Sequence, residues 1–152
     1  MKLELISRLS DDKTHAPPLL FVHGAWHAAW CWQEHFIPYF AARGWDCYAL
    51  SLRGHGGSEG RLRWASVADY AADIDQIVQQ IGKRPVMVGH SMGGYVVQKY
   101  LETHTLPAAV LMASVPSRGT LGLLLRSVRD HPLAVLEMQL TFDLYPLVGT
   151  PG

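Results

Sequence analysis

Short apolar runs recur along the chain at intervals, and each is long enough for one buried strand. They cover residues 19–22, 46–52, 85–89 and 108–113. Continuous apolar runs of this length are typical of parallel strands that are covered on both faces. Residues 2–9 alternate instead between polar and apolar side chains, which predicts an edge strand.

Amphipathic stretches with helical spacing lie between these runs. The clearest covers residues 66–81, where Ser66 and Asp69 resemble a capping box and Gly82 ends the pattern. Its apolar residues fall on one face, and they are Val67, Tyr70, Ala71, Ile74, Ile77, Val78 and Ile81.

Two further helices are predicted, over residues 32–42 and 93–104, so that strands and helices alternate along the chain. This alternation predicts an α/β fold, with a mostly parallel sheet and helices on both faces. The tail from residue 117 differs, because it holds two apolar runs broken at Pro132 and no further strand.

Composition narrows the function classes. The chain has 152 residues, of which 49% are hydrophobic and 17% charged, which fits one globular domain. Lys+Arg and Asp+Glu both number 13, so no basic excess points to nucleic acid. Neither a membrane span nor a signal peptide is visible, and Cys31 and Cys47 form no zinc spacing. We expect a cytoplasmic protein without a metal or an organic cofactor.

The strongest chemical signal is the sequence GHSMG at residues 89–93. It matches G-x-S-x-G and lies between a predicted strand and a predicted helix, as a nucleophile elbow requires. Small flanking residues let the turn close tightly, and the helix N-terminus favours developing negative charge. Ser91 is therefore the candidate nucleophile.

A second motif, HGAW, directly follows the first buried strand. A nucleophilic serine needs an oxyanion hole, for which we expect the backbone N–H groups of Met92 and Ala25. Trp26 and His90 are weaker candidates for the substrate pocket. The side chain of His23 is expected to be structural.

These motifs together resemble the N-terminal part of an α/β-hydrolase, in the order FVHGAWHAAWCW, LSLRGHGGSEG and VMVGHSMGG. The first is similar to plant methylesterase and hydroxynitrile-lyase-like members, and the second to bacterial esterase and lysophospholipase-type members. Ser51 stands where many members have Asp in D-x-R-G-x-G, which we interpret as a loop difference without catalytic consequence. The resemblance implies that residues 1–116 form the N-terminal part of the core and residues 117–152 the start of a truncated apolar cap.

The resemblance also implies a triad in the order Ser, acid, His, with the last two on loops after strands that follow the cap. Glu102 and His104 lie roughly 16–20 Å along the helix from Ser91, which is too far, and His131 in the tail is a poor base. We therefore expect a serine hydrolase of carboxylic esters whose base, acid and C-terminal strands are missing here. The 152-residue chain alone is expected to be inactive.

Alternatives remain open at this point. Hydroxynitrile lyases, haloperoxidases and C–C hydrolases share similar motifs, and the chain could also be an inactive truncated product that binds a ligand. The expected substrate is a small ester with an apolar part. An unpaired sheet edge at residues 108–113 predicts self-association.

Overall fold

The computed structural model describes residues 1–11, 17–119 and 121–141, and it divides into two compact units. The first is Met1–Ser117 and the second is Arg118–Gly152. The interpretation of the tail as a cap over the substrate remains a prediction.

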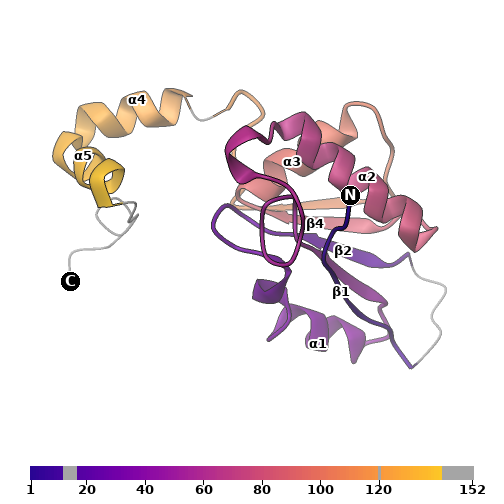
Figure 1. Ribbon diagram of the computed structural model, residues 1–152. Coiled ribbons are helices and arrows are strands. Elements are labelled where there is room, and N and C mark those ends of the chain that lie inside the picture. The colour runs from indigo at the N-terminus through magenta and orange to yellow at the C-terminus, as the bar shows by residue number, and fades with distance from the viewer. Residues whose placement is uncertain (12–16, 120, 142–152) are drawn as a thin grey trace. The chain divides into compact units, whose positions relative to one another are not determined.

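A five-stranded sheet forms the centre of the first unit (Figure 1). The strand order is β1-β3-β2-β4-β5, in which β1 pairs antiparallel with β3 and the remaining pairs are parallel. The predicted antiparallel edge strand and the mostly parallel sheet are thus both present. The strands are β1 (Leu5–Arg8), β2 (Leu19–Val22), β3 (Cys47–Leu50), β4 (Val86–His90) and β5 (Ala109–Met112).

Helices cover both faces of this sheet. Successive residues of a strand point to opposite faces, so Leu20 and Phe21 of β2 enter two different apolar clusters. The cluster around Leu20 packs under α2 (Val67–Ile81) and α3 (Met92–Leu101). The cluster around Phe21 packs under α1 (Phe36–Ala41) and the short 3₁₀ turn Ala29–Trp32, called η1. Figure 1 shows α2 and α3 on one side of the sheet and α1 on the other, which confirms the predicted fold class.

The helix predicted over residues 32–42 is shorter than expected, and the segment before it forms the separate turn η1. Proline has no N–H, and its ring clashes with the carbonyl of the residue four places earlier, so it fits only in the first turn of a helix. Pro38 is the third residue of α1. The helix therefore cannot extend back to Trp32.

The bounds of α2 follow the prediction closely. The Ser66 hydroxyl accepts a hydrogen bond from the Asp69 N–H at 3.1 Å, and the Asp69 carboxylate accepts one from the Ser66 N–H at 2.9 Å. This is a complete capping box. Gly82 follows the helix with φ of 71°, where a side chain would be strained.

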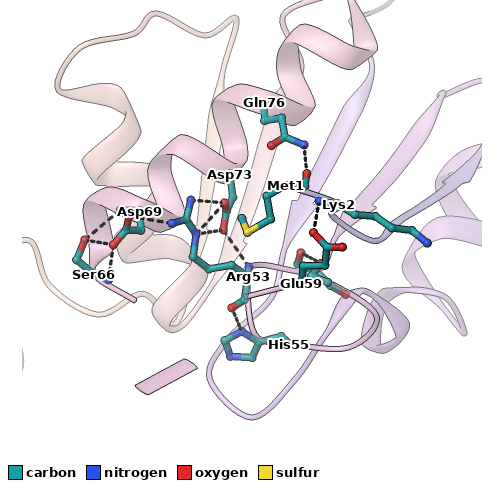
Figure 2. A network of polar contacts seen from close by, with 11 residues as sticks. Met1, Lys2, Arg53, His55, Glu59, Ser66, Asp69, Asp73 and Gln76 are labelled. Atoms are coloured by element: carbon teal, nitrogen blue, oxygen red, sulfur yellow. Dashed lines mark hydrogen bonds and ion pairs between the residues drawn. The ribbon is translucent and has the colours of Figure 1, made fainter. Parts of the chain in front are cut away.

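An ion-pair network ties the loop after β3 to α2 (Figure 2). The Arg53 guanidinium lies 2.7 Å from Asp73 and 2.8 Å from Asp69, and the Arg53 N–H also donates to Asp73 at 2.9 Å. Only 1% of Asp73 is exposed. Several hydrogen bonds to a buried carboxylate fix the start of this loop firmly.

We expect Arg53→Met to lower the free energy of unfolding by about 2 kcal/mol, because Asp73 would lose most of its charge-assisted hydrogen bonds while staying buried. Urea unfolding measures the change. Lys99→Met is the matched control, since it removes an ion pair to Glu102 that lies at the surface. Equal effects of the two substitutions would show that the network adds nothing to stability.

β5 lies at one edge of the described sheet and is largely open to solvent. Val110 is 47% exposed and Leu111 is 44% exposed. Self-association through this edge stays a prediction.

The second unit contains two helices, α4 (Leu121–Asp130) and α5 (Pro132–Thr141). α5 begins at Pro132, where the missing N–H has no helical partner to lose. The predicted break at this residue is therefore confirmed. Among the described helices, none is both long enough and apolar enough to cross a bilayer.

Candidate active site

Ser91 occupies the tight turn between the end of β4 and the start of α3. Its φ is 52° and its ψ is −115°, a conformation that is rare for any residue other than glycine. Backbone hydrogen bonds hold the turn: the Ser91 N–H donates to the Met112 carbonyl at 3.0 Å, and the Ser91 carbonyl accepts from Val115 N–H at 3.1 Å. Within the described residues, the Ser91 hydroxyl forms no hydrogen bond.

Glycines around the turn let α3 approach the sheet at backbone distance. A Cβ on Gly93 would overlap the carbonyl oxygens of Val22 and His23 at the end of β2. A Cβ on Gly89 would lie 2.7 Å from the Gly93 carbonyl oxygen. Both positions of the GHSMG motif therefore require glycine for steric reasons.

The HGAW segment lies beside Ser91, and its role as an oxyanion loop stays a prediction. A Cβ on Gly24 would be 3.2 Å from the Ser91 Cβ and 3.0 Å from His90 Nδ1. Ala25 directly follows Gly24, and Met92 directly follows Ser91. Neither the Ala25 N–H nor the Met92 N–H donates a hydrogen bond to any residue that the structure describes.

Trp26 turns the chain in this loop with φ of 59°. A bulky side chain at positive φ is strained, and such strain gathers at functional sites. The indole is 70% exposed and does not line the cavity beside the turn. The His27 Nδ1–H donates a hydrogen bond to the Ala25 carbonyl oxygen at 2.9 Å and thereby stabilises the loop.

A cavity of about 250 Å³ adjoins the residue before Ser91. His90, the second predicted pocket residue, lines it, and most of the remaining wall is apolar or aromatic. The lining residues are His27, Cys31, Trp32, Phe36, His90 and Met112.

His23 is fully buried and connects the start of the HGAW loop to the end of β3. Its Nε2 accepts a hydrogen bond from the Leu52 N–H at 3.1 Å, and its Nδ1 lies 2.7 Å from the Gly24 carbonyl oxygen, to which it donates. These two bonds need the neutral ring with the proton on Nδ1. Burial lowers the pKa of His23 from 6.5 to about 4, with further lowering from His55 and His27. The side chain is a structural link, as predicted.

Acidification is expected to destabilise the fold through His23. Because its pKa is lower in the folded state than in the unfolded chain, its contribution is complete above about pH 6.5 and is lost between pH 6.5 and about 4. The loss amounts to about 3 kcal/mol over that interval. Urea unfolding at pH 7, 5.5 and 4.5 measures it. His23→Gln, which cannot titrate, should show a flatter dependence, and equal slopes for both proteins would contradict the assignment.

The histidine that follows α3 lies away from Ser91. His104, which follows the distal end of α3, stacks on Tyr100 at 4.1 Å and lies 3.5 Å from Asp75. The His104 ring therefore interacts with Tyr100 and Asp75 and not with Ser91. This agrees with the long distance between Ser91 and His104 that the sequence predicts. No cluster of three His, Cys, Asp or Glu side chains that could hold a metal occurs in the described part of the chain.

Comparisons with known proteins place these observations in context. A family model described as "Alpha/beta hydrolase family" matches residues 19–150. A non-heme haloperoxidase of Rhodococcus erythropolis is 34% identical over 103 residues, which cover 65% of this chain and 37% of that protein. Methyl jasmonate esterase 1 of Vitis vinifera is 31% identical over 86 residues, which cover 55% of this chain and 33% of that protein.

A solved structure gives a similar result. The monoacylglycerol lipase of Paleococcus ferrophilus superposes with a TM-score of 0.66 at 26% identity, over 87% of this chain and 53% of the lipase. The chain spans less than half of the length of the curated relatives it matches.

Proposed function

This chain belongs to the alpha/beta hydrolase family, and from that premise we propose that it carries the nucleophile of a serine hydrolase that cleaves carboxylic esters. The observation that carries the proposal is Ser91, held at φ of 52° between β4 and α3 with a hydroxyl that bonds to no described residue. A strained serine at a strand-to-helix turn is what nucleophilic attack needs. Curated relatives and solved neighbours that are named esterases and lipases support it.

In the proposed reaction, the Ser91 oxygen attacks the carbonyl carbon of the ester while a histidine takes its proton. The tetrahedral intermediate then breaks its bond to the alcohol oxygen, which receives that proton, and leaves an acyl group on Ser91. Water releases the acid in a second, equivalent step. The proposal assigns the histidine and its acidic partner to the part of such proteins that this chain does not match, because the matched segments cover 43% and 37% of two relatives.

The oxyanion is proposed to bind the N–H groups of Met92 and Ala25. Both donors are without a partner among the described residues, and both lie next in sequence to the closely approaching pair Ser91 and Gly24. Met92 is also the first residue of α3, where the helix dipole favours negative charge. One such donor contributes about 10²- to 10³-fold to kcat where it has been measured.

The substrate is proposed to be a small ester with an aliphatic or aromatic part. The cavity beside His90 has room for a compact apolar group, and Trp32, Phe36 and Met112 form much of its wall. Trp26, exposed on the neighbouring loop, is proposed as a contact at the rim of the substrate site.

A second candidate is haloperoxidase activity, favoured by the match to a non-heme haloperoxidase.

The test of the two candidate functions uses the longest product that the gene encodes. Hydrolysis of 4-nitrophenyl esters of increasing acyl length is compared with peroxide-dependent bromination of phenol red. A fluorescent phosphonate probe is then added, and mass spectrometry identifies the labelled residue. Ester hydrolysis with the label on Ser91 is expected; bromination without ester hydrolysis would favour the second candidate.

A further inference from the structure

Ser51, which directly follows β3, is fully buried and bonds to two segments at once. Its hydroxyl lies 2.5 Å from the Glu4 carboxylate and 2.9 Å from the Ala29 backbone nitrogen. A carboxylate accepts hydrogen bonds only, so the Ser51 proton points to Glu4. The oxygen of Ser51 is then free to accept the Ala29 N–H. The three groups form a directed chain from Glu4 through Ser51 to Ala29.

Backbone hydrogen bonds fix the position of Glu4 beside Ser51. Its carbonyl oxygen accepts from the Ser51 N–H at 3.0 Å, and its own N–H donates to the Ser58 hydroxyl at 2.8 Å. Hydrogen bonds from the Ser51 hydroxyl and the Gly57 N–H lower the pKa of the Glu4 carboxyl, which therefore stays ionised. An ionised acceptor strengthens the bond to Ser51 and, through it, the bond to Ala29.

Two hydrogen bonds anchor the two ends of the HGAW loop to the segment after β3: one is made by Ala29 and the other by His23. The Leu52 N–H donates to His23 before the loop, and the Ser51 hydroxyl accepts from Ala29 after it. Ser51 and Leu52 are consecutive and directly follow β3, which ends at Leu50. The loop between these anchors contains Trp26 at positive φ, a conformation that its surroundings must maintain.

We propose that Glu4 is a positioning residue that acts through Ser51 to hold the loop bearing the Ala25 N–H beside Ser91. The inference rests on the proposed function, in which that N–H stabilises the oxyanion. It revises the interpretation of Ser51 as a difference without catalytic consequence. Where many members of the family have Asp at this position, this chain supplies the carboxylate from its N-terminal segment by way of a serine hydroxyl.

The test measures kcat and KM for a 4-nitrophenyl ester in the longest gene product. Glu4→Gln puts an amide NH₂ against either the Ser51 O–H or the Gly57 N–H, and Ser51→Ala removes the acceptor of Ala29. Each is expected to lower kcat about tenfold with KM changed less than twofold, since the displaced donor acts on the transition state. Combining Glu4→Gln with Ser51→Asp, which offers Ala29 a carboxylate directly, should recover most of kcat.

Glu59→Gln is the matched control. Its carboxylate also binds the N-terminal segment, by accepting the Lys2 N–H at 2.9 Å (Figure 2). The hydrogen bonds of the Ser51 hydroxyl and the Ala29 N–H involve Glu4 and each other, and not Glu59. Glu59→Gln should leave kcat unchanged. Glu4→Asp serves as a milder variant should Glu4→Gln unfold, because it keeps the charge and shortens the reach. Unchanged kcat in the folded Glu4 and Ser51 variants would overturn the proposal.

Amide hydrogen exchange separates this inference from the proposed function. By NMR, the Ala29 amide should exchange at least tenfold faster in Glu4→Gln and Ser51→Ala than in the parent protein or in Glu59→Gln. If the parent protein hydrolyses no ester but Ala29 exchanges faster in the two variants than in the parent, the link from Glu4 to Ala29 is supported while the proposed function fails. Unchanged Ala29 exchange in both variants would overturn the inference whatever the activity of the parent.

Discussion

Replacing Ser91 by alanine in the longest gene product is expected to lower kcat for ester hydrolysis by about 10⁴- to 10⁶-fold. The substitution removes the atom that is proposed to form the acyl intermediate, so that only oxyanion stabilisation and binding remain. The free energy of unfolding should not decrease, because alanine bears the strained φ of 52° no worse than serine does and the Ser91 hydroxyl bonds to no described residue. Steady-state kinetics with a 4-nitrophenyl ester, together with labelling by the phosphonate probe, measures the effect.

Ser114→Ala is the control for this experiment. Ser114 also lies close to the start of α3, where its hydroxyl accepts a hydrogen bond from Gln98 at 2.8 Å. Its loss should change kcat less than tenfold and leave the labelling intact. A Ser91→Ala variant that retained the kcat of the parent protein would exclude Ser91 as the nucleophile.

Gly93→Ala is expected to lower the free energy of unfolding by about 4 kcal/mol or more. The added methyl would overlap the carbonyl oxygens of Val22 and His23 and lie 2.8 Å from the Val22 carbonyl carbon. These are backbone atoms of the central strand β2 and its extension, which cannot rotate away as a side chain can. Losses of this size are exceptional for a single methyl group. Urea unfolding followed by circular dichroism measures the difference.

Gly122→Ala is the matched control, because the same methyl on α4 would meet no atom within 4 Å. It should leave stability unchanged or raise it by about 0.5–1 kcal/mol, since glycine is unfavourable inside a helix. If Gly93→Ala and Gly122→Ala behaved alike, α3 would not pack against β2 as closely as the structure shows.

The sequence predicted those parts of the fold that local signals determine. The capping box at Ser66 and Asp69 fixed the start of α2, and the apolar run over β2 fixed a strand covered on both faces. The helix over residues 32–42 was wrong at its start, because the apolar pattern outweighed the one local signal against it, Pro38. The sequence alone also did not give the strand order, which depends on contacts between distant segments.

In the candidate site too, the sequence predicted the local motifs and missed the contacts between distant residues. GHSMG and HGAW are local motifs, and the structure brings Gly24 of one beside Ser91 of the other. Glu4 was missed, because nothing in its neighbourhood of the sequence marks a residue that bonds to Ser51, 47 positions away. The available signal was Ser51 itself, since a motif that lacks its usual carboxylate raises the question of where another one comes from. The Arg53–Asp73 pair was missed for the same reason.

The hydrogen-bonded chain from Glu4 to Ala29 has an evolutionary consequence. On the proposal above, positions 4 and 51 are inherited as a unit, because one carboxylate from either position supports the loop. Homologues with an acidic residue at position 51 would be free to vary position 4, whereas homologues with serine at position 51 should retain glutamate there. A lineage passing between the two arrangements would gain the second carboxylate before it lost the first. The residue found at position 4 would then indicate which of the two arrangements supports the loop in each homologue.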